Sequence, residues 1–119
     1  GLSYSDFAYE KIESVKQDKK NIRVTVSVKN TSGRDGEEVV QLYASYPDSK
    51  VERPSKQLRA FKRIPIKAGE SREVTLTVPK EELGYWNEEK QMFVVEPGTV
   101  KLLIGASSED IRLEGKIRL

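Results

Sequence analysis

Apolar and polar residues alternate along most of this chain, which is the pattern of half-buried β-strands. The alternation places Val, Leu or Ile at nearly every second position of four segments, residues 21–30, 72–78, 99–105 and 111–119. Residues 39–46, VVQLYASY, are more densely apolar and predict a central strand packed on both faces. Phe7, Tyr9 and the residues that follow predict a first strand, and MFVVE at residues 92–96 predicts another.

The segments between these strands have the chemistry of turns. TSGRDG at residues 31–36 supplies two glycines and an aspartate, and KAGE and EPGT at residues 67–70 and 96–99 each place a glycine between strands. PKEEL at residues 79–83 predicts one helical turn, because Pro79 suits a helix start and acids suit its first turn. No longer segment shows a 3.6-residue period. Short strands separated by Gly and Pro turns predict an all-β sandwich in a single domain, residues 1–119.

Composition removes several classes of function. The chain contains neither cysteine nor histidine, so disulfides, thiolate catalysis, zinc sites of the cysteine type and the usual general base are absent. No apolar run approaches the roughly 18 residues that cross a bilayer, so no membrane partner is expected. The N-terminus lacks the features of a signal peptide and an initiator Met, which we interpret as a fragment or a processed form. Cysteine usage does not decide the compartment; a periplasmic or secreted location is favoured for the parent protein, with the cytoplasm as the alternative.

Positive charge gathers in one segment. The formal net charge is +2, yet Lys50 to Arg63 carries six cations and one acid. Nucleic acid is not expected as a partner, because Phe61 is the only aromatic residue here and no reading motif is present. Two interpretations stay open: a solvated face, or a docking surface for another protein domain. We expect Leu58 and Phe61 to face the core from a strand.

Other candidate features have plain structural explanations. The acidic pairs, such as Glu37–Glu38, are neighbours whose side chains point to opposite faces of a strand, so they cannot act together across a sugar. No phosphate-binding glycine pattern occurs. Asn30 begins an N-glycosylation sequon, but an asparagine leading into a turn explains it better. Tyr85–Trp86 has two interpretations, packing in the core or between domains, and stacking on a sugar ring. We predict no catalytic, cofactor or metal residue.

Four motifs in order resemble one known family. They are the opening GLSY, the GEEVVQLY strand, the RPSKQLRAFKRI segment and the EPGTVKLLIGASS hairpin. Together they resemble the fibronectin type III-like domain that ends family-three glycoside hydrolases, the β-glucosidases and β-xylosidases. The resemblance covers nearly the whole chain. One departure is Ala60, where the family often has glycine.

The resemblance implies an immunoglobulin-like sandwich of about seven antiparallel strands, placed after two catalytic domains of the same parent chain. Those domains carry the nucleophile and the acid/base, so no catalytic residue is carried over to this chain. The expected function is a non-catalytic accessory domain that packs on and stabilises the catalytic domains; the alternative is a module that binds carbohydrate or another polymer. Arg53, Pro54 and Lys56 are the candidate docking residues, since Pro54 restricts the loop and Arg53 suits carboxylates. Tyr85 and Trp86 are the candidate aromatic contacts.

Overall fold

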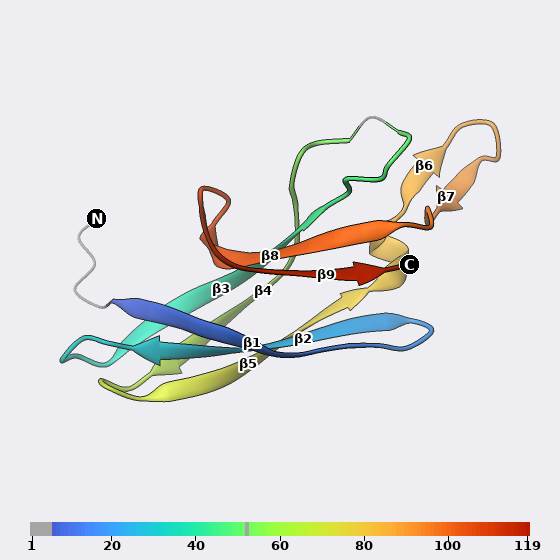
Figure 1. The fold of residues 1–119 in the computed structure, drawn as a ribbon. Helices are drawn as coiled ribbons and strands as arrows, with labels where there is room; N and C mark the ends of the chain where they lie inside the picture. The colour runs from blue at the N-terminus through green and yellow to red at the C-terminus, as the bar shows by residue number, and fades with distance from the viewer. Residues whose placement is uncertain (1–5, 52) are drawn as a thin grey trace.

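The computed structural model describes residues 6–51 and 53–119, and these form two β-sheets packed face to face (Figure 1). The first sheet has strand order β1-β2-β5 and the second β4-β3-β8-β9. The strands are β1 (Phe7–Gln17), β2 (Asn21–Asn30), β3 (Gly36–Ser45), β4 (Gln57–Ile66), β5 (Ser71–Pro79), β8 (Thr99–Ser107) and β9 (Asp110–Arg118). All their pairings are antiparallel. The GLSY motif lies outside the described residues.

Two short strands stand apart from the sandwich. A 3₁₀ turn η1 (Lys80–Leu83) leads from β5 into β6 (Tyr85–Asn87), which pairs with β7 (Met92–Val94). The described residues thus contain nine strands, seven in the sandwich as expected and two in this hairpin. The hairpin projects beyond one end of the sheets in Figure 1. Pro79 stands before η1, which confirms the predicted helical turn.

The core lies between the two sheets, where the alternation of the sequence places it. In β2, Val24, Val26 and Val28 are fully buried, and Val40, Leu42 and Ala44 of β3 face them from the other layer. β3 is central in its sheet, as predicted, but its other face carries only half-buried residues such as Tyr43. The expectation that β3 is packed on both faces is therefore wrong for the described chain, because a two-layer sandwich covers only the inner face of each sheet.

Two features shape the connections. Gly69 and Gly98 have positive φ, which confirms the glycine turns predicted at residues 67–70 and 96–99. Asn30 is fully buried: its amide nitrogen donates to the carbonyls of Arg34 and Ile66, and its side-chain oxygen accepts from Ser32. The asparagine therefore anchors the turn, and its side chain is inaccessible in the fold. Among the described residues no helix has the length and apolarity to cross a membrane.

Candidate docking surface

The basic segment begins with an arginine that is built into the domain. The guanidinium of Arg53 donates to the carbonyl oxygen of Leu83 at 3.0 Å and forms an ion pair with Glu96 at 2.8 Å. It also stacks over the ring of Tyr46, at 4.0 Å from the centroid, and lies 5.3 Å from the ring centre of Tyr85. Its side chain is only 7% exposed. Arg53 therefore ties the loop after β3 to the chain on both sides of the hairpin.

Glu96 is the carboxylate to which this loop is hydrogen-bonded. It accepts hydrogen bonds from the Ser49 hydroxyl at 2.6 Å, from the Lys50 backbone N–H at 3.1 Å and from Arg53. The Ser49 hydrogen bond, with those from Lys50 and Arg53, holds the pKa of Glu96 below its usual value, against the opposing effect of burial. Glu96 is thus charged at neutral pH and holds the loop through these three hydrogen bonds.

The two basic candidates of the loop, Arg53 and Lys56, have partners inside the domain. Arg53 already has Glu96 as its carboxylate, and the Lys56 ammonium donates to the carbonyl oxygen of Ser108. Pro54 is exposed, as expected for a loop residue. Involvement of this loop in docking stays a prediction. The partners of Arg53 and Lys56 lie 43 and 52 residues further along the chain, so no local pattern indicated them.

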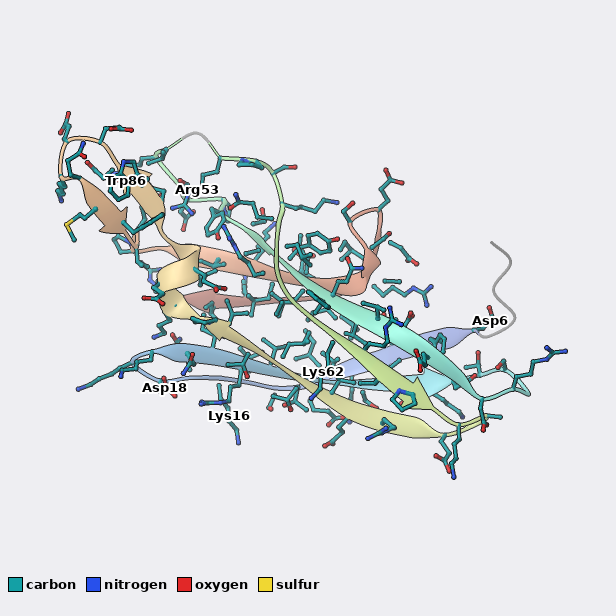
Figure 2. All side chains as sticks on the ribbon, turned by 180° about the vertical axis from the view of Figure 1, so that it is seen from behind. Asp6, Lys16, Asp18, Arg53, Lys62 and Trp86 are labelled. Carbon is teal, nitrogen blue, oxygen red and sulfur yellow. The ribbon has the colours of Figure 1, made fainter. Side chains whose placement is uncertain are left out.

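Tyr85 and Trp86 lie on opposite faces of the hairpin, as neighbouring strand residues must. Tyr85 faces Arg53, whereas Trp86 packs edge-to-face on Phe93, with centroids 5.3 Å apart at 74°. Trp86 is 45% exposed and Phe93 64%, so within the described chain Trp86 is not a core residue. Packing between domains and sugar stacking both remain predictions for it. Figure 2 places Trp86 beside Arg53, at the end of the domain away from Asp6.

Leu58 and Phe61 face outward, so the expectation that they face the core is wrong. Phe61 is 66% exposed and Leu58 46%. Side chains alternate between the two faces of a strand, and Ile64 faces the core. Phe61 and Arg63 therefore point to the opposite, outer face. Leu58 differs because the pairing register of β3 and β4 shifts next to Leu42. Leu42 pairs with Ala60 and Tyr43 pairs with Leu58, which leaves Arg59 as an extra residue in β4. That β-bulge turns Leu58 to the outer face.

The outer face of the four-stranded sheet is consequently partly apolar, with Gln41 opposite Phe61 and accepting a hydrogen bond from the Tyr43 hydroxyl. Register and pleat place three half-buried side chains in line with Leu58 and Phe61, namely Val39, Tyr43 and Leu103. We call these five residues the outer face. Salt bridges flank it, Arg63–Glu37 at 3.6 Å and Lys101–Glu114 at 3.7 Å. An apolar stripe with a charged rim is typical of a protein interaction site.

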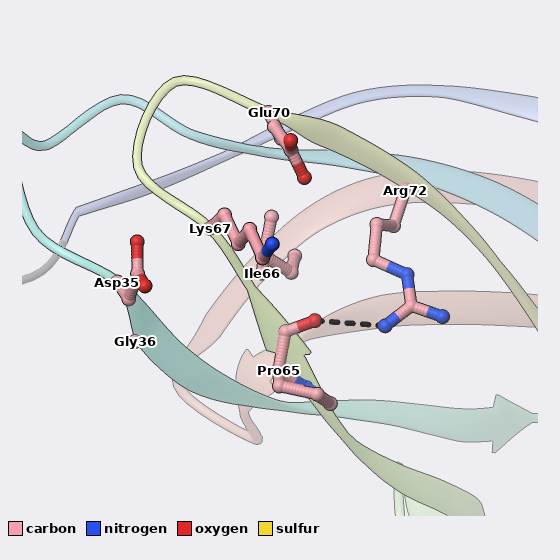
Figure 3. Close-up of a pocket in the computed structure, with 7 residues that line it drawn as sticks. All are labelled: Asp35, Gly36, Pro65, Ile66, Lys67, Glu70 and Arg72. Carbon is pink, nitrogen blue, oxygen red and sulfur yellow. Dashed lines mark hydrogen bonds between the residues drawn. The ribbon is translucent and has the colours of Figure 1, made fainter.

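Other parts of the described chain offer less chemistry. A hollow of about 330 Å³ lies at the turn between β4 and β5, and Figure 3 shows the residues that line it. Among them, Arg72 donates to the carbonyl of Pro65 at 2.9 Å. The residues described contain no group of three or more acidic side chains arranged for a metal ion. The acidic pair beginning β3 is split as predicted, with Glu37 paired to Arg63 and Glu38 accepting from Tyr9. Burial and Glu38 raise the pKa of Tyr9, which stays neutral.

Curated proteins similar to this chain include β-glucosidases. The chain is 36% identical to the probable β-glucosidase D of Emericella nidulans and 39% identical to the thermostable β-glucosidase B of Acetivibrio thermocellus. The matches cover 97% and 100% of the chain but only 16% of each relative. The β-glucosidase structure from Kluyveromyces marxianus superposes with a TM-score of 0.93 at 36% identity, covering all of this chain and 14% of that one.

A second solved structure agrees, β-glucosidase 3B from Thermotoga neapolitana, with a TM-score of 0.89 at 38% identity over 99% of this chain. It too is matched over only 16% of its length. A family model, the fibronectin type III-like domain, matches residues 38–108, which include the outer-face strands, the Arg53 loop and the hairpin. The chain therefore belongs to the fibronectin type III-like domain family, as the small domain found within β-glucosidases.

Proposed function

We propose that this domain is a non-catalytic accessory domain that packs on and stabilises the catalytic domains of a β-glucosidase-type chain. The observation that carries the proposal is the outer face, where Phe61 and Leu58 expose large apolar side chains on a sheet that the described chain leaves uncovered. A partner that covered this face would remove Phe61 from water, and burial of one such side chain stabilises a complex by about 1.5–3 kcal/mol.

Charge supports the same partner. Arg63 shares this face with Phe61 and its side chain is 71% exposed, so an acidic group on the partner would suit it. The relatives are about six times longer than the segment matched here, which leaves ample chain to supply it. Hydrolysis itself would belong to those other domains.

The test compares Phe61→Gln with Lys16→Gln, because Lys16 is exposed on β1, in the other sheet. Both variants are made in the isolated chain and in the full-length parent protein. We expect Phe61→Gln to lower the melting temperature of the parent and to leave that of the isolated chain unchanged, while Lys16→Gln changes neither. A parent protein that melts at the same temperature with Phe61→Gln would refute docking through the outer face.

A further inference from the structure

Exposed apolar side chains gather at a second place, the hairpin end. Four of the six large hydrophobic residues exposed in the described chain lie there, namely Trp86, Met92, Phe93 and Val95. Trp, Phe and Met are the residue types enriched at the centres of protein interfaces. The tertiary fold thus leaves two apolar surfaces uncovered, and the outer face accounts for only one of them.

The hairpin is held in one orientation by the body of the domain. Arg53 binds Leu83 just before β6 and Glu96 just after β7, so one guanidinium fastens both ends of the hairpin. At Gly84 an added Cβ would lie 2.8 Å from the backbone oxygen of Val94, which shows how closely the two sides approach. A surface fixed before binding loses little conformational entropy when a partner arrives.

Two carboxylates lie beside the hairpin, in a hollow that it shares with the start of β4. This hollow of about 760 Å³ beside Phe93 is lined by the side chains of Gln57, Arg59, Glu81 and Glu82. The hollow thus contains two carboxylates and one guanidinium, and the guanidinium of Arg59 already donates to Gln57 at 2.6 Å. A lysine or arginine side chain of a partner suits such a site, because it can pair with the carboxylates while lying against an aromatic ring.

We propose that the hairpin end is a second docking surface for the remainder of the parent chain, which presents there an apolar patch bearing a basic side chain. This inference rests on the proposed function, since it assumes the same partner. Gln57 and Arg59 at the start of β4 line the same hollow as Phe93, so the hairpin end adjoins the outer face and one partner can cover both.

Hydroxyl-radical footprinting tests this directly, because Trp86 and Met92 are the only tryptophan and methionine of the chain. Their oxidation is compared by mass spectrometry in the isolated chain, whose folding is checked by cooperative unfolding, and in the full-length parent. We expect Trp86 to be protected several-fold in the parent, while Met92, on the opposite face of the hairpin, reports on that other face. Equal oxidation of Trp86 in both proteins would overturn the inference, and Phe61 protection in the same experiment would report separately on the proposed function.

Charge reversal supplies the second arm. The double variant Glu81→Lys with Glu82→Lys in the parent should restore oxidation of Trp86, which packs on Phe93 beside the hollow, whereas Glu70→Lys with Glu73→Lys, exposed residues not lining the hollow, should not. Continued protection of Trp86 in the first variant would contradict a basic partner side chain. Protection of Trp86 in the isolated chain by a neutral β-glucan oligosaccharide, with none in the parent, would assign the hairpin to sugar binding and overturn the proposal.

Discussion

Replacing Arg53 with alanine tests whether this side chain fastens the loop and the hairpin. The change removes the ion pair with Glu96, the hydrogen bond to Leu83 and the stacking on Tyr46. Removing one partner of a buried ion pair costs about 3–5 kcal/mol, and a cation–π contact contributes about 0.5–2 kcal/mol. These ranges give an upper limit for the loss in free energy of unfolding caused by Arg53→Ala.

Two features of the site reduce this cost. Glu96 is 18% exposed and keeps its hydrogen bonds from Ser49 and Lys50, so it is not left as an isolated buried charge. The Nε of Arg53 is buried without a partner in the described chain, and its removal relieves that penalty. We therefore expect Arg53→Ala to lower the free energy of unfolding by about 3 kcal/mol.

Urea unfolding at pH 7 measures the effect. For a urea dependence of about 1–3 kcal/mol per molar, the midpoint should fall by on the order of 1–3 M. Arg63→Ala is the control, because Arg63 is 71% exposed in a long surface pair and should cost less than about 1 kcal/mol. A double-mutant cycle with Glu96→Gln should show coupling of at least about 1 kcal/mol. If Arg53→Ala were no more costly than Arg63→Ala, the fastening role would be wrong.

Three further outcomes follow from the same contacts. Gly105→Ala should destabilise the chain by about 2 kcal/mol or more in the urea assay, because the added Cβ would lie 2.0 Å from the Asp110 carbonyl oxygen. Gly33→Ala is the control and should be tolerated, because no atom lies within 4 Å of its added Cβ. Leu42→Ala should cost about 2–5 kcal/mol by urea unfolding, since Leu42 is fully buried. Because the folded-state pKa of Glu96 is lowered, its contribution is present above about pH 4.5 and is lost as the pH falls through that lowered pKa. Unfolding measured between pH 7 and pH 3 should show this loss in the wild type and a smaller one in Glu96→Gln.

Local patterns in the sequence were sufficient for the frame of this domain. Alternation in residues 21–30 and 72–78 predicted β2 and β5, because period two places every second side chain on the core face. Glycines at turns and Pro79 before η1 predicted the connections, because backbone conformation there depends on the residue itself. The small hairpin strand β6 was not predicted, since three residues are too few to show a period.

The candidate surfaces depended on the tertiary structure. The β-bulge at Arg59 decided the side on which Leu58 lies, and Glu96, 43 residues away, decided that Arg53 is held inside the domain. Trp86 is large enough for a core residue, but the core between the two sheets consists mainly of Val, Leu and Ile, and Trp86 lies partly exposed on the hairpin. Alternation and turn chemistry act over a few residues and are therefore legible in the chain. Charge partners, bulges and exposure depend on segments that meet only when both sheets pack, and no local pattern encodes them.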